Sequence, residues 1–115
     1  MGFKFEKLDV WQKAVGLYAE VCHTANRIPR MEQSSLGDQT RRATLSVSTN
    51  IAEGTGRDGL KEARYFYNVA KGSVYEVVSL LYVMRERHYV QDAEYEHLYA
   101  RCDEIARMLS GLLAR

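Results

Sequence analysis

Two pairs of side chains have the residue types and the spacing that could hold a two-metal centre. Both pairs follow the pattern Glu-x-x-His, and they are Glu20 with His23 and Glu94 with His97. Ferritin-like proteins bind two metal ions through two such pairs on two helices and one glutamate on each of the other two helices. This chain also has one glutamate in each of its two middle segments, Glu53 and Glu76. The complete set of ligand types is therefore present.

The positions of these side chains relative to the apolar residues argue against a metal centre. Ligands at the centre of a helix bundle must all point inward. Cys22 lies on the apolar stripe of the first segment, so His23 falls one step off that stripe. Leu98 lies on the apolar stripe of the fourth segment, so His97 falls beside it. The sequence predicts solvated charges rather than a metal site, and it predicts no cofactor.

No other pattern points to catalysis. The serines of the helical segments lack the G-x-S-x-G turn that exposes a nucleophile in hydrolases. Cys22 and Cys102 both lie on apolar stripes, where thiols usually serve as small hydrophobic groups. We expect no catalytic residue and no enzymatic activity.

The stretch Gly54-Thr55-Gly56 has two glycines in three residues, as some phosphate-binding loops do. A Walker loop needs G-x-x-x-x-G-K-[ST] after a strand, whereas here a helical segment comes first. A glycine that closes a helix explains the stretch well. The alternative is the turn of a DNA-reading helix pair, but the apolar rhythm after Asp58 continues to Met84, which is too long for a recognition helix. We expect a hairpin between two long helices.

Four segments of helical periodicity hold all of these residues. Their apolar residues recur at alternating steps of three and four, the rhythm of packed helices. The stripe of the first segment is Leu8, Trp11, Val15, Tyr18, Cys22 and Ala25, and that of the fourth is Tyr95, Leu98, Cys102, Ile105, Leu109 and Leu112. The sequence predicts an all-α fold, an antiparallel up-down-up-down four-helix bundle, in a single domain over residues 1–115. The expected helices span about residues 9–28, 36–54, 59–87 and 92–113.

Composition narrows the class of protein. Of 115 residues, 46% are hydrophobic and 27% are charged, and the formal net charge is +1, which leaves nucleic-acid binding open without supporting it. The first residues are charged, unlike a signal peptide, and no apolar run is long enough to cross a bilayer. Two cysteines do not make a disulfide framework. We expect a reduced, cytoplasmic protein with no membrane partner.

Polar residues interrupt the stripes of the second and third helices. We name this set the polar seam, and its members are Ser46, Asn50, Glu53, Ser73 and Glu76. Buried polar groups must be hydrogen-bonded, and such groups often fix the register of packed helices. In an antiparallel hairpin Glu76 falls near the start of the second helix, so we expect it to pair with Arg41 or Arg42.

Two further sets of residues are candidates for contact with a partner. The basic group, for a nucleic-acid backbone or another partner, is Arg41, Arg42, Arg57, Lys61 and Arg64. The alternative role of these side chains is structural pairing. The candidate oligomer interface points away from the expected stripes and consists of Leu45, Tyr75, Val78 and Tyr82. Its alternative is a broad core that includes these residues.

The order of motifs resembles one known family. The first block is Gln39-Thr40-Arg41-Arg42-Ala43, Ser46-Val47, Asn50-Ile51-Ala52-Glu53-Gly54 and Gly56-Arg57, and the second is Phe66, Ala70-Lys71-Gly72-Ser73 and Glu76. Leu8-Asp9-Val10-Trp11, Pro29 and Glu32 also fit. The chain resembles the four-helix-bundle proteins encoded by intervening sequences of bacterial large-subunit (23S) ribosomal RNA genes. It departs from their pattern at Ser34-Ser35-Leu36 and at Ser48.

This resemblance implies an antiparallel bundle that assembles as a ring-like homopentamer, with no established enzymatic activity. The family is related to the accessory variability determinant of diversity-generating retroelements, in which a basic pentamer contacts nucleic acid and a reverse transcriptase. We therefore expect a non-enzymatic homopentamer that acts as an assembly or adaptor protein for an RNA or protein partner. The alternative is an RNA- or DNA-binding factor that uses the basic group.

Overall fold

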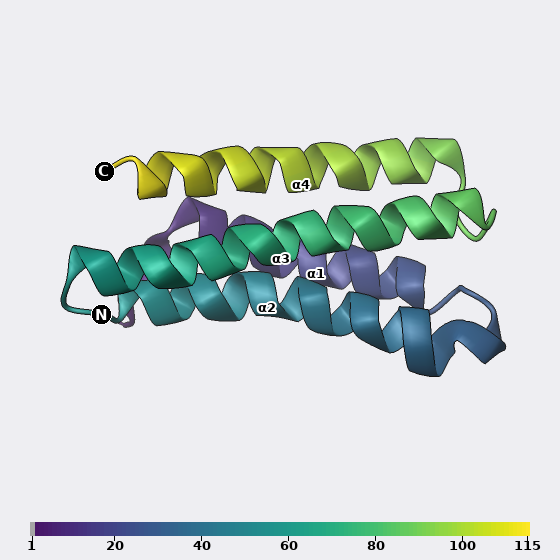
Figure 1. The fold of residues 1–115 in the computed structure, drawn as a ribbon, viewed down its shortest axis with the longest axis horizontal. Helices are drawn as coiled ribbons and strands as arrows, with labels where there is room; N and C mark the ends of the chain where they lie inside the picture. The colour runs from purple at the N-terminus through teal and green to yellow at the C-terminus, as the bar shows by residue number, and fades with distance from the viewer. Residues whose placement is uncertain (1) are drawn as a thin grey trace.

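The computed structural model describes residues 2–115 and consists of four long helices (Figure 1). They are α1 (Asp9–Ala25), α2 (Asp38–Thr55), α3 (Leu60–Glu86) and α4 (Asp92–Leu113). Successive helices run in opposite directions, and α4 returns to pack beside α1 as well as α3. In this order α1 lies diagonal to α3, and α2 lies diagonal to α4. The predicted all-α, four-helix fold is confirmed.

The connection between α1 and α2 is longer than the sequence suggested. The first helix ends at Ala25 rather than near residue 28, and the second begins at Asp38 rather than near residue 36. A 3₁₀ turn at Arg30–Glu32 and one wide turn at Gln33–Gly37 fill the gap. The Gln33 amide donates hydrogen bonds to the carbonyl oxygens of Ala25 (2.9 Å) and Ile28 (3.0 Å). These bonds tie the connection to the end of α1, where backbone carbonyls lack partners within the helix.

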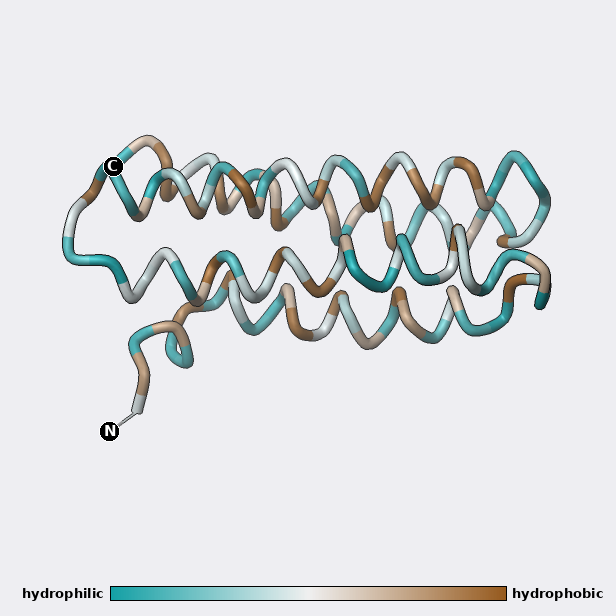
Figure 2. The backbone as a smooth tube through the Cα atoms, turned by 60° about the horizontal axis from the view of Figure 1, so that its bottom comes forward, coloured by the Kyte–Doolittle hydropathy of each residue, from teal (hydrophilic) through white to brown (hydrophobic). Residues whose placement is uncertain are grey.

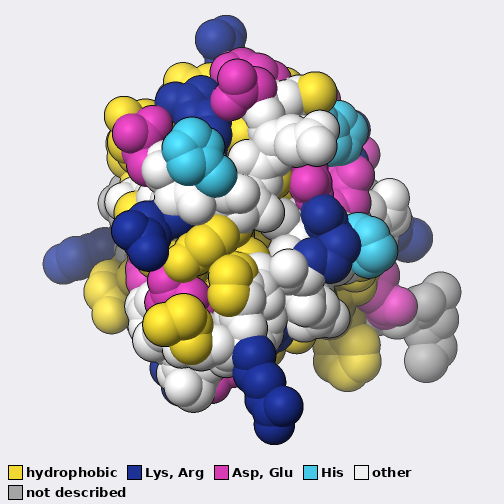
Figure 3. Space-filling view, turned by 90° about the vertical axis from the view of Figure 1, so that its right-hand side faces the viewer, with side chains coloured by type: hydrophobic (Ala, Val, Ile, Leu, Met, Phe, Trp, Pro, Cys, Tyr) yellow, Lys and Arg dark blue, Asp and Glu magenta, His cyan; other side chains and the backbone are white. Residues whose placement is uncertain are grey.

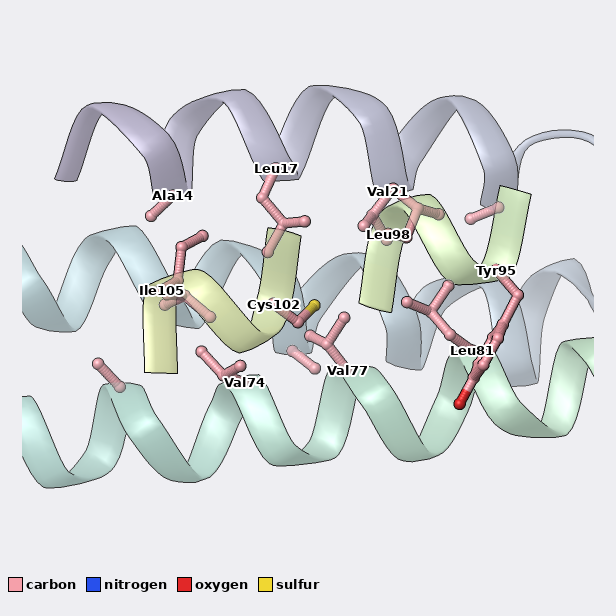
Figure 4. Close-up of a cluster of buried hydrophobic side chains, with 14 of the residues drawn as sticks. Ala14, Leu17, Val21, Val74, Val77, Leu81, Tyr95, Leu98, Cys102 and Ile105 are labelled. Atoms are coloured by element: carbon pink, nitrogen blue, oxygen red, sulfur yellow. The ribbon is translucent and has the colours of Figure 1, made fainter. Parts of the chain in front are cut away.

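The core lies between the inward stripes of the four helices (Figure 4). The stripe of α4 is as expected, with Tyr95 through Leu109 buried at steps of three and four. Figure 2 shows hydrophobic positions recurring along each helix between hydrophilic ones. The fully buried side chains include Leu17, Leu81 and Ile105, which come from three different helices. One core therefore joins all the elements.

The expected stripe of α1 is wrong by one position. The buried residues of this helix are Val10, Ala14, Leu17, Val21, Thr24 and Ala25. Val15, which the sequence placed in the core, is 42% exposed. The error has a physical reason, because α1 carries two apolar stripes with the same spacing and only one of them can face the bundle centre. The second stripe, from Trp11 to Cys22, lies on the flank of α1.

The α2–α3 pair packs most closely of the four neighbouring pairs, and the α1–α4 pair least closely. Small side chains such as Ala43 and Ala70 lie between α2 and α3. At Gly54 an added Cβ would lie 2.5 Å from Cε1 of Tyr67 and 3.2 Å from the carbonyl oxygen of Ala63. The small residues thus let the two backbones approach each other.

Long polar side chains span the α1–α4 edge. Lys13 pairs with Glu104 at 3.5 Å, and Glu20 accepts hydrogen bonds from Arg101 and His97. Further along, Glu94 accepts from Thr24 at 2.5 Å and from Arg27. Burial raises the pKa of the Glu94 carboxyl, but these two donors outweigh burial and hold that pKa below its ordinary value. The α1–α4 edge is therefore wider and more polar than the α2–α3 edge.

The turn between α3 and α4 requires one unusual backbone conformation. His88 has a φ of 62°, in the left-handed region. The N–H of Tyr89 donates to the carbonyl of Met84 (2.8 Å), and the N–H of His88 donates to that of Arg85 (2.9 Å). These two bonds are the Schellman pattern that closes helices. The turn thus ends α3 sharply, so that α4 can return along it.

Candidate functional site

The two Glu-x-x-His pairs meet on the α1–α4 edge and not in the core. A shallow groove of about 320 Å³ on this edge is lined by both pairs, Glu20 with His23 and Glu94 with His97. Its carboxylates already bond to Arg27 and Arg101. Glu53 and Glu76 lie on the other two helices. Within residues 2–115, no three His, Cys, Asp or Glu side chains are grouped closely enough to hold a metal ion.

The basic group is divided between the two ends of the bundle. Arg41 and Arg42 lie in the first turns of α2, whereas Arg57, Lys61 and Arg64 lie around the α2–α3 turn at the opposite end (Figure 1). Arg57 lies sixteen positions after Arg41, which corresponds to roughly 24 Å along a helix. Figure 3 looks onto the end where α2 begins, and there positive and negative side chains are interspersed. The structure does not bring the five side chains into one patch.

Arg41 braces the fold at the α1–α2 connection. Its guanidinium donates to Oδ1 of Asn26 on the α1 side at 2.8 Å. It also donates to the carbonyl oxygen of Gln33 at 3.2 Å and pairs with Asp38 at 2.9 Å. Because Arg41 has three partners within the chain, its main role is to stabilise the connection between α1 and α2.

The other basic side chains differ in their contacts. Arg57 pairs with Glu53 at 2.6 Å and lies 4.6 Å over the ring of Phe66. Arg64 donates to the terminal carbonyl oxygen of Arg115. Arg42 and Lys61 form no ion pair with any other residue between 2 and 115. These two are the members of the basic group with a free charge in the described chain.

Three members of the polar seam form one cluster between α2 and α3. The hydroxyl of Ser73 donates to Oγ of Ser46 at 2.8 Å, and the amide of Asn50 donates to Oγ of Ser46 at 2.9 Å. Glu53 lies outside this cluster and pairs with Arg57. Glu76 accepts a hydrogen bond from the side chain of Gln39. The expected pairing of Glu76 with Arg41 or Arg42 is wrong, because Gln39 lies on the flank of α2 that faces α3 and Arg41 turns toward α1.

An apolar face runs along the groove between α1 and α2. The Arg41–Asn26 hydrogen bond shows which flanks of the two helices meet. Residues at steps of three and four from these two positions lie on the same flanks. We name them the α1/α2 face, and they are Val15, Tyr18, Cys22, Leu45 and Ala52. Val15 and Leu45 are 42% and 43% exposed, so the face is not covered within the chain.

A second apolar face runs along the groove between α3 and α4. It surrounds a hollow of about 220 Å³. Tyr75, Val78, Tyr99 and Ala106 line this hollow together with the charged Asp103, and Tyr82 lies next to it through Tyr95. We name the apolar residues Tyr75, Val78, Tyr82, Tyr99 and Ala106 the α3/α4 face. Tyr75 is 65% exposed, so most of its ring is open to solvent beside the hollow. The guanidinium of Arg85 lies 5.0 Å over the ring of Tyr82, which helps to hold that ring in place.

The two faces lie on opposite edges of the bundle. The helices follow each other around the bundle, so the α1–α2 groove is across from the α3–α4 groove. The candidate oligomer interface of the sequence is therefore split, with Leu45 on one face and Tyr75, Val78 and Tyr82 on the other.

Sequence reasoning placed Val15, Tyr18 and Cys22 in the core and did not single out Tyr99. The signal was that α1 has a further apolar stripe, Val10, Ala14, Leu17 and Val21, beside the one that was predicted to face the core. When a helix has two apolar stripes, one can face the core and the other remains on the surface of the bundle.

The thiol of Cys102 lies beneath the α3/α4 face. Burial raises its pKa to about 12. Because the thiolate is the reactive form, we expect Cys102 to resist iodoacetamide at pH 8 in the folded protein and to react after unfolding in guanidinium. Peptide mass spectrometry of alkylated samples measures this directly. Equal labelling of Cys102 with and without denaturant would contradict the buried position.

The chain is similar to a known protein family and to a solved structure. Residues 6–111 match the family described as 23S rRNA-intervening sequence protein. The chain is also similar to a crystal structure from Bacteroides thetaiotaomicron, a protein of unknown function from the S23 ribosomal protein family. The two share 17% sequence identity and a TM-score of 0.85, over 92% of this chain and 99% of that one. No curated protein is similar enough to count as a match. None of the helices within residues 2–115 is long and apolar enough to cross a membrane.

Proposed function

Because the chain belongs to the 23S rRNA-intervening sequence protein family, we propose that it is a non-enzymatic homo-oligomer that serves as an assembly or adaptor protein. One observation carries this proposal, namely that two apolar faces stay exposed on a bundle whose core is already complete. Contiguous exposed apolar surface on a soluble protein marks a site of association. The number of copies, five, comes from the resemblance given above.

We propose that this role is non-enzymatic. Neither the family's description nor that of the Bacteroides protein mentions a reaction. In the groove on the α1–α4 edge Glu20 is bonded to His97 and Arg101, and Glu94 is bonded to Arg27. An adaptor protein needs surfaces that bind its partners, and the candidates are the α1/α2 face and the α3/α4 face.

The test of the proposal is the mass of the wild-type chain in solution. We expect native mass spectrometry to give five times 13.2 kDa, and we expect the change Leu45→Glu or Tyr75→Lys to lower that mass. Each change places a charge on a face that must lose water on association, which is unfavourable unless the charge is paired. The matched control is Ala93→Glu, which adds a charge to an exposed position four residues before His97. A monomeric wild-type protein at micromolar concentration would overturn the proposal.

The alternative function, RNA or DNA binding through the basic group, has a separate test. The free side chains Arg42 and Lys61 lie at opposite ends, so a nucleic-acid backbone would have to span the bundle or the assembly. Binding of a labelled RNA that weakens with rising salt, and that Arg42→Ala with Lys61→Ala abolishes, would favour this function over a protein adaptor.

A further inference from the structure

The two apolar faces differ in shape and chemistry, which decides how copies of this chain can meet. The α1/α2 face presents aliphatic and small side chains, with Val15 and Leu45 projecting from it. The α3/α4 face presents a hollow of about 220 Å³ that is lined by two tyrosines, Tyr75 and Tyr99, and has Asp103 in its wall; a third tyrosine, Tyr82, is exposed nearby. Two hollows placed against each other would leave space unfilled, whereas a projecting leucine can fill a hollow. The faces are complementary to each other rather than to themselves.

We propose that copies of this chain join head to tail, with the α1/α2 face of one copy on the α3/α4 face of the next. This inference rests on the proposed homo-oligomer and names the surfaces that form it. An interface between unlike faces is heterologous, and it leaves one unused face at each end until a ring closes. The position of the faces on opposite edges suits this arrangement, because one bundle can contact two neighbours at once.

The charges beside the two faces also favour this pairing. Arg42 lies three residues before Leu45 on α2 and is exposed. Glu86 follows Tyr82 by four residues on α3, and Glu96 precedes Tyr99 by three on α4. All three lie at the same end of the bundle, where α2 and α4 begin and α3 ends (Figure 1). Copies packed side by side in the same direction therefore bring Arg42 toward the acidic residues of the next copy.

Two of these charges lack a partner within one chain. Neither Arg42 nor Glu86 takes part in an ion pair with any residue between 2 and 115. If two α1/α2 faces packed against each other in the same direction, Arg42 of one copy would instead lie close to Arg42 of the other. Two positive charges repel each other, so this arrangement is unfavourable. Glu96 already pairs with Arg85 at 3.7 Å, so head-to-tail contact of parallel copies is the arrangement that gives Arg42 and Glu86 partners of opposite sign.

The experiment uses two full-length variants, each with one blocked face. Leu45→Glu blocks the α1/α2 face and keeps the α3/α4 face, and Tyr75→Lys does the reverse. We expect each variant alone to be monomeric in native mass spectrometry. Mixed at equal concentration, they should form a dimer with one copy of each, because one intact face of each kind remains. The two variants differ in mass, so the mixed dimer is distinct from either homodimer.

Other outcomes would overturn the proposal. A homodimer of either variant alone would indicate contact between like faces, and a mixture that stays monomeric while the wild type assembles would exclude this pair of faces. A monomeric wild type would instead refute the proposed function itself. Circular dichroism checks the fold of each variant. Val15→Glu and Tyr99→Lys replace the first pair if either variant is unfolded, since both positions are exposed.

A second measurement follows the α1/α2 face directly. Cys22 is partly exposed on this face. In the wild-type assembly we expect Cys22 to react with iodoacetamide at least tenfold more slowly than in Tyr75→Lys, whose α1/α2 face is unchanged but unoccupied. Equal rates in an assembled wild type and a monomeric variant would place the contact elsewhere.

Discussion

Replacement of Leu17 by alanine should lower the free energy of unfolding by about 2–5 kcal/mol. Leu17 is fully buried and points from α1 into the centre of the bundle (Figure 4). Deleting its three outer carbons removes apolar contacts and leaves a cavity that the surrounding helices fill only in part. Urea unfolding, followed by circular dichroism at equal protein concentrations, measures the change.

The matched control for Leu17 lies two residues earlier on the same helix. Val15 is 42% exposed in a single chain, so in the monomeric Tyr75→Lys protein, whose α1/α2 face is unoccupied, Val15→Ala should change stability by no more than about 1 kcal/mol. The pair decides the orientation of α1, because the apolar rhythm that includes Val15 would put this residue in the core. A larger loss at Val15 than at Leu17 would mean that α1 is turned to the other stripe.

Two glycine-to-alanine changes should move stability in opposite directions. At Gly54 the new methyl group would lie 2.5 Å from the ring of Tyr67 and 3.2 Å from the backbone oxygen of Ala63, so we expect a loss of about 1–3 kcal/mol. At Gly72, inside α3, the methyl group would meet nothing within 4 Å. Alanine is the better helix former there, and a gain of about 0.5–1 kcal/mol should follow.

The comparison separates close packing from helix propensity. Both changes add the same methyl group to a helical position of the α2–α3 hairpin, so a propensity effect alone would stabilise both variants. Thermal unfolding of the two variants beside the wild type gives the sign of each effect. A stabilised Gly54→Ala protein would show that Tyr67 moves aside at little cost and that α2 and α3 do not depend on a glycine here.

The spacing of apolar residues along each segment was enough to predict the four helices, because the residues that face the core recur at steps of three and four. The stripe of α4 from Tyr95 to Leu109 was predicted correctly, since no second apolar stripe competes with it. On α1 two stripes compete, and the choice between them depends on the positions of α2 and α4. That information lies outside the segment, so the sequence pattern could not settle it.

The positions of the candidate site residues were harder to predict for the same reason. Leu45 and Tyr75 both point away from the expected stripes, but a helical pattern does not say on which edge of a bundle each residue lies. The five basic residues are close in sequence, yet a long helix places Arg41 and Arg57 at opposite ends. The partner of Glu76 was also missed, because the rotation of α2 turns Gln39 rather than Arg41 toward α3.

The unequal widths of the bundle's edges have a consequence for the size of a head-to-tail assembly. The α2–α3 edge is narrow because Ala43 and Ala70 lie between its helices, and the α1–α4 edge is kept wide by pairs such as Lys13 with Glu104. Units that are narrower at one edge than at the other form a curved row when they pack side by side. In the proposed head-to-tail assembly each added copy would contribute the same curvature, and a row whose rotation closes would form a ring of fixed size. The α2–α3 edge would then line the inside of the arc, and the side chains along that edge would set its radius.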